Sequence, residues 1–168
     1  RIAALVEYPR NDAHRLIEEC MIAANIAAAR FLDRSHVPTL YRVHGMPEED
    51  RLETLRQFLR EFGLWLPPAG EVTAQHLRDL LQKLGDRPDA LLVSTAVIRS
   101  MPQAVYQPGN IGHFGLALEH YAHFTSPIRR YPDLVVHRGI RQVLQGGDPQ
   151  ELVAWHGPFP MLGQDCSF

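Results

Sequence analysis

The stretch Tyr121-Ala-His-Phe-Thr-Ser-Pro-Ile-Arg-Arg-Tyr-Pro-Asp133 contains the strongest local structure signals in this sequence. Ser126 can cap the first free amides of a helix, and Pro127 suits the first helical position because its missing N–H would go unused there. Apolar residues then recur at helical spacing, at Ile128, Tyr131, Leu134, Val135, Val143 and Leu144. The pattern predicts a helix of about five turns that starts at Ser126 and ends at Gly146-Gly147.

Two arginines, Arg129 and Arg130, fall in the first turn of this predicted helix. The positive end of the helix dipole disfavours a cation there by about 0.3–1 kcal/mol. Paired guanidinium groups beside free backbone amides are typical of a site for an anion. An alternative is an exposed i,i+4 ion pair between Arg129 and Asp133, stabilising by a few tenths of a kcal/mol. Spacing alone leaves both interpretations open.

Longer runs around this stretch carry a family resemblance. Gly112-His-Phe-Gly-Leu-Ala-Leu118, the stretch above and His137-Arg138 together resemble the signature of the ribonuclease II/ribonuclease R (RNB) family, with the ribonuclease R branch the nearer. That family consists of processive, magnesium-dependent 3′-to-5′ exoribonucleases that degrade single-stranded RNA to nucleoside 5′-monophosphates. The resemblance implies an α+β fold, in which this chain is a mostly helical segment of an RNB-type catalytic domain with a few short strands.

A second block, Arg15-Leu-Ile-Glu-Glu-Cys-Met-Ile-Ala-Ala-Asn25, resembles another part of the same family. By that resemblance Glu18 lines the catalytic pocket and contacts the sugar of the terminal nucleotide. The plain alternative is a glutamate that makes a favourable dipole contact near a helix start. Helical spacing places Glu18, Ile22 and Asn25 on one stripe, so a carboxylate and an amide face the same space.

The resemblance implies a role for Arg129 as the group that grips the scissile or adjacent phosphate. It makes Arg129 and Glu18 the candidate catalytic residues. The candidate RNA-binding residues are Arg130, His123, Phe124, Arg138, His113 and Ser126. Rings in this region suit base stacking, which is worth about 1–3 kcal/mol per base and tolerates any sequence. The alternative is that most rings are core, and we expect this for most of Phe114, Tyr121 and Tyr131.

Magnesium is the cofactor that the resemblance implies for the complete enzyme, and we expect its ligands to lie outside this chain. The family supplies them as closely spaced aspartates upstream of the Glu18 block, whereas the aspartates here are scattered singly. His120-x-x-His123 is too loose a spacing to predict a metal site. Dinucleotide, Walker and zinc-protease motifs are absent, so we expect no small-molecule cofactor.

Composition sets further limits on partners and compartment. The formal net charge is −2, so RNA contacts require a local cluster instead of a generally basic surface. The two cysteines, Cys20 and Cys166, form no disulfide framework, which favours a reducing cytoplasm. No apolar run approaches the roughly 18 residues of a membrane span, so we expect no membrane partner.

Helical periodicity organises most of the remaining chain. We expect an extended segment at residues 1–9, helices at about 12–32, 47–62, 73–84 and 88–101, and strands at 40–43 and 114–121. Residues 47–101 would form a small helical subdomain. The sequence opens at Arg1 without an initiator methionine and stops at Phe168 without a terminal turn. The resemblance implies that residues 1–168 are the C-terminal portion of an RNB catalytic domain, with cold-shock and S1 domains outside it.

The functional prediction is thus part of a 3′-to-5′ exoribonuclease that supplies phosphate and 3′-nucleotide contacts. The isolated chain is expected to be inactive, because the metal-binding aspartates lie elsewhere. The main alternative is a non-catalytic RNA-binding or interaction module that keeps the fold and lacks the metal site. A purely structural helical domain would require the Ser126–Arg130 pattern to be a coincidence.

Overall fold

Helices account for most of residues 11–148 and 150–167, the part of the chain that the computed structural model describes. The helices are α1 (Asp12–Arg34), α2 (Glu49–Glu61), α3 (Ala74–Leu84), α4 (Ala90–Ser100), α5 (Tyr131–Leu144), α6 (Gln150–His156) and α7 (Phe159–Asp165). Short 3-10 turns, η1 (Ala69–Glu71) and η2 (Phe114–Leu116), and two strands, β1 (Tyr41–Val43) and β2 (Val105–Gln107), complete the fold. The expected mostly helical α+β class is confirmed. The extended segment expected at residues 1–9 lies outside the described residues.

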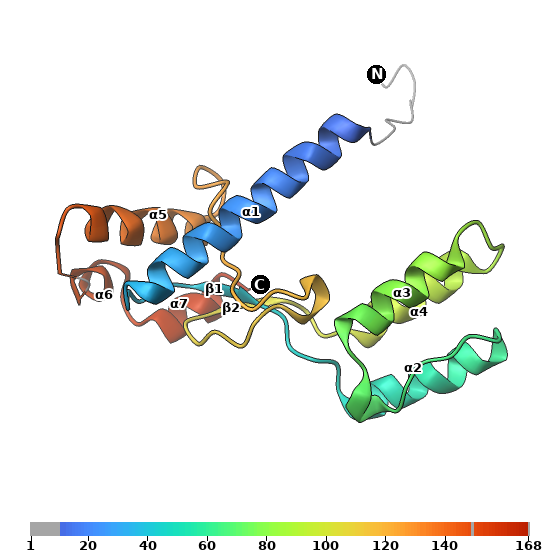
Figure 1. Cartoon of the computed structure of the whole chain (residues 1–168). Helices are drawn as coiled ribbons and strands as arrows, with labels where there is room; N and C mark the ends of the chain where they lie inside the picture. Colours follow the sequence, from blue (N-terminus) through green and yellow to red (C-terminus); the bar gives the residue numbers. More distant parts are fainter. Residues whose placement is uncertain (1–10, 149, 168) are drawn as a thin grey trace, which may run out of the picture.

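The first core lies where the second half of α1 packs on α5, with α6, α7 and the strands nearby (Figure 1). The helices α1 and α5 approach closely because α5 carries a glycine at the crossing. A Cβ at Gly139 would lie only 3.2 Å from Cδ2 of Leu32. The buried members of this core, which we call the loop core, are Ala28, Ala29, Leu32, Val37, Leu40, Tyr41, Val43, Ala122, Val135, Val136, Leu152 and Phe159.

The first half of α1 projects away from this core (Figure 1). Every residue from 11 to 20 is exposed. Asn11 caps the helix by accepting a hydrogen bond from the His14 N–H at 3.1 Å. Helical spacing places Ile17 and Cys20 on the stripe that is buried further along α1, but Ile17 is 59% exposed and Cys20 is exposed. Their helical spacing is correct, but no described element covers this part of the helix.

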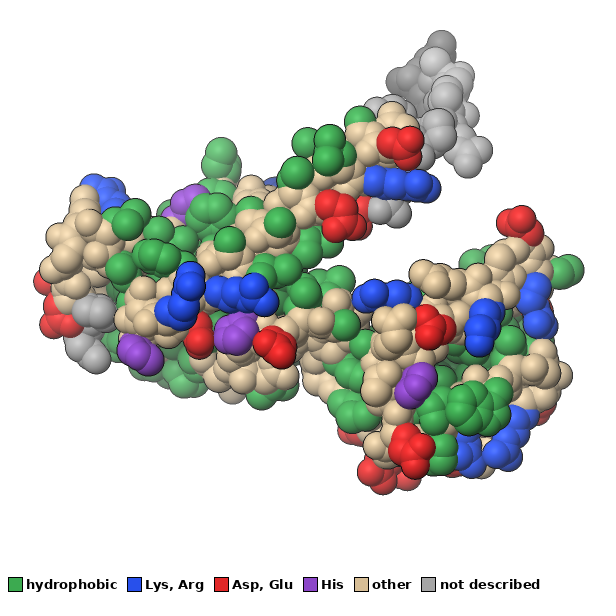
Figure 2. Space-filling view, viewed as in Figure 1, with side chains coloured by type: hydrophobic (Ala, Val, Ile, Leu, Met, Phe, Trp, Pro, Cys, Tyr) green, Lys and Arg blue, Asp and Glu red, His purple; other side chains and the backbone are tan. Residues whose placement is uncertain are grey.

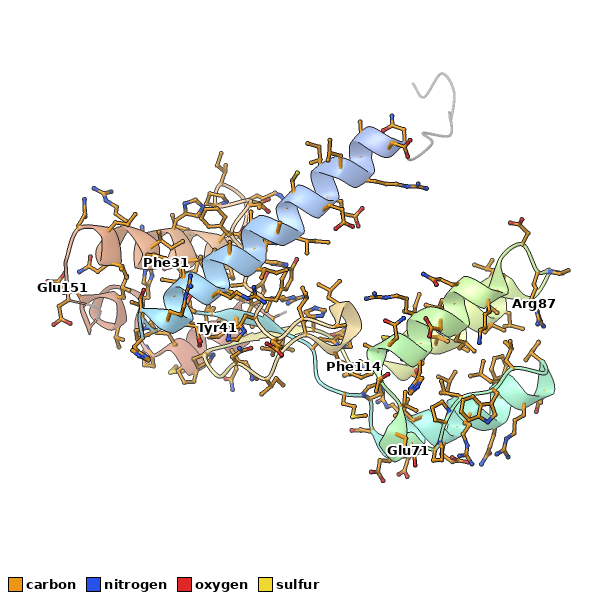
Figure 3. All side chains as sticks on the ribbon, viewed as in Figure 1. Phe31, Tyr41, Glu71, Arg87, Phe114 and Glu151 are labelled. Atoms are coloured by element: carbon orange, nitrogen blue, oxygen red, sulfur yellow. The ribbon has the colours of Figure 1, made fainter. Side chains whose placement is uncertain are left out.

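A second core joins α2, α3 and α4 into a three-helix group (Figures 1 and 3). Its buried members are Leu52, Leu55, Leu59, Leu66, Val72, Leu77, Leu80, Leu84, Val93 and Val97. Thr73 starts α3 as expected, by accepting from the His76 N–H. Phe114 of η2 packs against this core from the other half of the chain. The predicted helices are confirmed, while their status as a separate subdomain stays a prediction.

The two strands form an antiparallel pair with Arg42 opposite Tyr106. The strand expected at 40–43 is confirmed. The strand expected at 114–121 is wrong, because the chain turns there. His113 accepts the Leu116 N–H on its Nδ1, and Ala117 adopts a left-handed conformation with φ 55°. Alternation of apolar residues alone did not reveal this local capping.

The helix α5 begins at Tyr131, five residues after the start that Ser126 and Pro127 predicted. Instead, the Ser126 carbonyl accepts from the N–H groups of Arg129 and Arg130 and closes a turn. Arg130 occupies the N-cap position in an extended conformation, and Pro132 takes the first turn of the helix. Proline at a helix start is therefore present, but the second Pro of the stretch supplies it.

Candidate functional site

Residues 121–130 form a loop between α1 and α5, which we call the clamped loop because helix side chains hold its backbone. Asn25 of α1 accepts a hydrogen bond from the Phe124 N–H on Oδ1, at 2.9 Å. His137 of α5 donates from Nε2 to the Phe124 carbonyl, also at 2.9 Å. Two helices thus grip the two polar groups of one residue, which fixes the path of the loop between them.

A third anchor of the clamped loop is Asp133, which is fully buried in the first turn of α5. Its Oδ1 accepts from the Ser126 N–H and from Nη2 of Arg130, each at 2.7 Å. Charge-assisted bonds of this length are among the stronger ones in proteins. Removing one partner of such a buried pair typically costs about 3–5 kcal/mol. The carboxylate therefore holds both ends of the turn at 127–129.

The ion pair between Arg130 and Asp133 makes the environments of the two adjacent arginines different. The Arg130 side chain is only 21% exposed and is bound to Asp133. Arg129 is exposed, and its side chain has no hydrogen bond or ion pair with any residue that the structure describes, although its backbone N–H donates to the Ser126 carbonyl. The alternative pairing of Arg129 with Asp133 is therefore not the one that forms. The turn instead presents Arg129 next to Ile128, whose side chain is fully exposed at 102%.

Aromatic rings surround the start of the clamped loop. Tyr121 makes edge contacts with His113 and His123, at centroid distances of 5.4 and 5.7 Å. The Tyr106 hydroxyl lies 2.7 Å from Nδ1 of His123. The guanidinium of Arg42 sits over the Tyr106 ring, 4.5 Å from its centroid. Rings from β2, the η2 region and the loop thus form one partly buried cluster.

Both candidate histidines of this cluster are held neutral at pH 7. Burial lowers the pKa of His123 to about 4, and the nearby positive charge of Arg130 adds to the effect. Burial, followed by the neighbouring His44, lowers the pKa of His113 to about 4 as well. Neutral imidazoles can stack and form hydrogen bonds, but they do not add positive charge for a phosphate.

The other predicted rings divide between core and surface. Phe124 stacks on His137 with centroids 4.2 Å apart and packs against the loop core, so its ring is engaged inside the protein. Tyr121 is buried and Phe114 packs on the second core, which confirms both as core residues. Tyr131 is the exception among the three, because it is 42% exposed and its hydroxyl contacts Nδ1 of His156 at 2.8 Å.

Of the remaining candidates, Glu18 and Arg138 lie apart from the clamped loop, and Ser126 is part of it. Glu18 lies on the exposed first half of α1, and Arg138 is exposed on α5. Ser126 contributes its backbone to the turn. Within residues 11–148 and 150–167, no three His, Cys, Asp or Glu side chains gather where they could hold a metal ion. His120 faces Asp33 at 3.2 Å.

Sequence reasoning missed the clamping roles of Asn25, Asp133 and His137. A signal existed for each of them. Asn25 is a polar residue at a position that helical spacing assigns to the packed side of α1. Asp133 and His137 are four residues apart, and so lie on one face of α5. Spacing could not show that this face of α5 and the packed side of α1 both contact the backbone of the clamped loop.

Comparison with known proteins identifies the family. The model of the RNB domain matches residues 1–146, and the chain belongs to the RNB family. Ribonuclease R of Escherichia coli K12 is 48% identical over 175 residues, covering 99% of this chain and 22% of the relative. Ribonuclease R of Vibrio cholerae is 48% identical over 155 residues, covering 92% and 19%. The chain therefore spans about a fifth of the length of these relatives.

Solved structures agree with this assignment. RNase R of Mycoplasma genitalium, in complex with ribose-methylated single-stranded RNA, superposes with a TM-score of 0.86 at 25% identity, covering 95% of this chain and 26% of that one. Yeast Ssd1, described as a pseudonuclease, gives 0.76 at 25% identity, covering 94% and 20%. Within the described part of the chain, no helix combines the length and apolar character needed to span a membrane.

Proposed function

We propose that this chain is the C-terminal part of the catalytic domain of a ribonuclease R-like 3′-to-5′ exoribonuclease that degrades single-stranded RNA processively to nucleoside 5′-monophosphates. The observation that carries the proposal is the free guanidinium of Arg129 on a clamped turn, inside the segment that the RNB model matches. The RNA-bound Mycoplasma relative supports the class of substrate. Both cysteines are free, which fits a reducing cytoplasm.

In this proposal Arg129 binds the scissile or adjacent phosphate. A guanidinium presents donors in a planar fork that matches two phosphate oxygens. The bonds of Asp133 to Ser126 and Arg130 hold the turn before RNA arrives, so little ordering remains to be done on binding. A pre-positioned donor of this kind stabilises the negative charge that develops on the phosphate in the transition state.

The proposed sugar contact is Glu18, which lies seven residues before Asn25 on the same face of α1. His123, His113 and Phe124 would line the RNA path as neutral groups. Arg138 would contact the RNA backbone from α5. Arg130 and Ser126 would act mainly by fixing the turn, because the structure already engages both with Asp133.

The magnesium that RNB exoribonucleases use does not fit the described residues of this chain, because their carboxylates and histidines do not gather into a metal-binding group. We assign its ligands to other parts of the complete polypeptide. This chain's own contribution is to bind and orient the RNA.

The test is the substitution Arg129→Ala in the complete polypeptide. We expect kcat on single-stranded RNA to fall by about 10²-fold or more, the scale seen when one transition-state donor is removed. Arg141→Ala is the matched control, because Arg141 is also an exposed arginine and lies in the last turn of α5. An Arg129→Ala enzyme that keeps most of its turnover would refute the assignment.

A second candidate is a non-catalytic RNA-binding module, favoured by the similarity to the yeast pseudonuclease. The two candidates differ in the sequence that precedes residue 1 in the gene. A cluster of closely spaced aspartates there supports the exoribonuclease, and its absence supports the module. In the second case Arg129→Ala would weaken RNA binding with no turnover to lose.

A further inference from the structure

Asn25 is a buried amide in the middle of α1, with only 3% of its surface exposed. Its Nδ2 donates to the Tyr121 hydroxyl at 3.1 Å, and its Oδ1 accepts the Phe124 N–H at 2.9 Å. Side-chain polar atoms inside proteins are nearly always paired, and here both ends of the amide are used. Both partners belong to the clamped loop, about a hundred residues later in the sequence.

The other anchors of the loop come from a different helix. Asp133 and His137 both lie on α5, so they hold the loop to that helix alone. Asn25 holds it to α1, the helix that carries Glu18. Glu18 lies on the exposed first half of α1, and the helix is tied to the loop further along, by Asn25 and by packing in the loop core.

We propose that Asn25 is a positioning residue that sets the spacing between the Glu18 helix and the Arg129 turn. The inference rests on the proposed function, because that function assigns the phosphate contact to Arg129 and the sugar contact to Glu18. Phosphate and sugar of one nucleotide are joined covalently, so their protein contacts must keep a fixed separation. A displacement of about 1 Å in such a site can cost about 10²-fold in rate.

The first test is Asn25→Ala in the complete polypeptide. We expect kcat on single-stranded RNA to fall by about 10- to 100-fold, with KM changed by no more than about threefold, because contacts along the rest of the RNA remain. The matched control is Gln142→Ala. Gln142 is also a buried amide with two hydrogen bonds, to the Asp148 carbonyl and to Glu151, near the opposite end of α5. We expect this control to lower stability and leave kcat unchanged within about twofold.

The second test asks whether Asn25 acts through Arg129. In an Arg129→Ala background, the further substitution Asn25→Ala should change kcat by less than about twofold, because the group being positioned is already gone. A full additional loss in the double variant, or a single Asn25→Ala variant with normal kcat, would overturn the inference and leave the proposed function intact. The proposed function fails separately, if Arg129→Ala alone keeps its turnover.

A third variant covers the case in which Asn25→Ala does not fold. Asn25→Asp keeps an acceptor for the Phe124 N–H, and the Tyr121 hydroxyl can rotate to donate to the new carboxylate. We expect this variant to keep kcat within about fivefold of the parent. A loss of about 10-fold or more in a folded Asn25→Asp protein would overturn the positioning role.

Discussion

The Asp133 carboxylate gives the adjacent residues Arg129 and Arg130 different environments. Asp133 binds Arg130 inside the protein, and the chain direction then turns Arg129 outward. The sequence predicted an anion site at this pair, but helical spacing suggested Arg129 and not Arg130 as the partner of Asp133. Distinguishing them requires knowing that Asp133 is buried, which depends on how α1, α5 and the loop pack together.

The neutral state of His123 and His113 has a consequence for stability against pH. Their folded-state pKa values of about 4 lie below the ordinary value of 6.5. As pH falls from 6.5 towards 4, the unfolded chain takes up protons that the folded chain does not bind. Stability should therefore decrease across this window. Urea unfolding measured at several pH values would show the decrease.

Variants can identify which histidines cause the decrease in unfolding free energy as the pH falls. His123→Phe removes one of the two groups, so the loss of unfolding free energy between pH 6.5 and 4 should become smaller. His36→Asn is the control, because His36 is exposed and Asn tolerates its left-handed backbone, φ 54°. An unchanged slope in His123→Phe would contradict the burial of a neutral imidazole at this position.

At the level of elements, hydrophobic periodicity predicted where the helices lie more accurately than it predicted where they begin. The buried stripes of α2 and α3 follow directly from leucine spacing, whereas α4 buries Val93 and Val97 and leaves Leu91 and Leu92 exposed. The start of α5 could not be predicted in the same way, because Ser126-Pro127 and Tyr131-Pro132 carry competing signals. The buried Asp133 favours the later start, since it accepts the Ser126 N–H from outside the helix.

The contact between α7 and β2 provides a test of packing at this scale. A Cβ on Gly163 would lie 2.5 Å from the Tyr106 carbonyl oxygen. Ala favours a helix over Gly by about 1 kcal/mol, but a methyl group at this distance forces the helix away from the strand. We expect Gly163→Ala to reduce the free energy of unfolding by about 1–3 kcal/mol, measured by urea denaturation.

The control for this prediction is Gly70→Ala, because a Cβ at Gly70 meets nothing within 4 Å. That variant should match the parent within about 0.5 kcal/mol. Equal stability of the two glycine variants would show that α7 does not press on β2 as the structure indicates.

For the whole molecule, the family assignment and the scattered carboxylates lead to a prediction about activity. We expect this 168-residue chain, expressed alone, to release no nucleotides from single-stranded RNA in the presence of magnesium. Its described residues do not gather the carboxylates that such hydrolysis requires. Measurable release of nucleoside 5′-monophosphates by a clean preparation would contradict this expectation.

The surface is also a property of the whole molecule. The sequence gives its net charge, but the exposure of its apolar side chains depends on the fold. The net charge of −2 is distributed as mixed acidic and basic side chains, as Figure 2 shows on one face. Large apolar side chains are exposed as well, on α1 at Leu16 and Ile17 and on α4 at Leu91 and Ile98. The sequence shows that these residues are apolar and lie on helices, but it does not reveal whether another part of the protein covers them.

The separation of the loop core from the core of the three-helix group has an evolutionary consequence. Substitutions at sites that share no partners combine additively, so a change of side chain within α2, α3 or α4 should not alter the geometry around Asn25 and Asp133. On the proposed function of Arg129, we expect the three-helix group to tolerate more sequence change than the loop that presents this residue. Homologues should diverge faster in the former than in the latter.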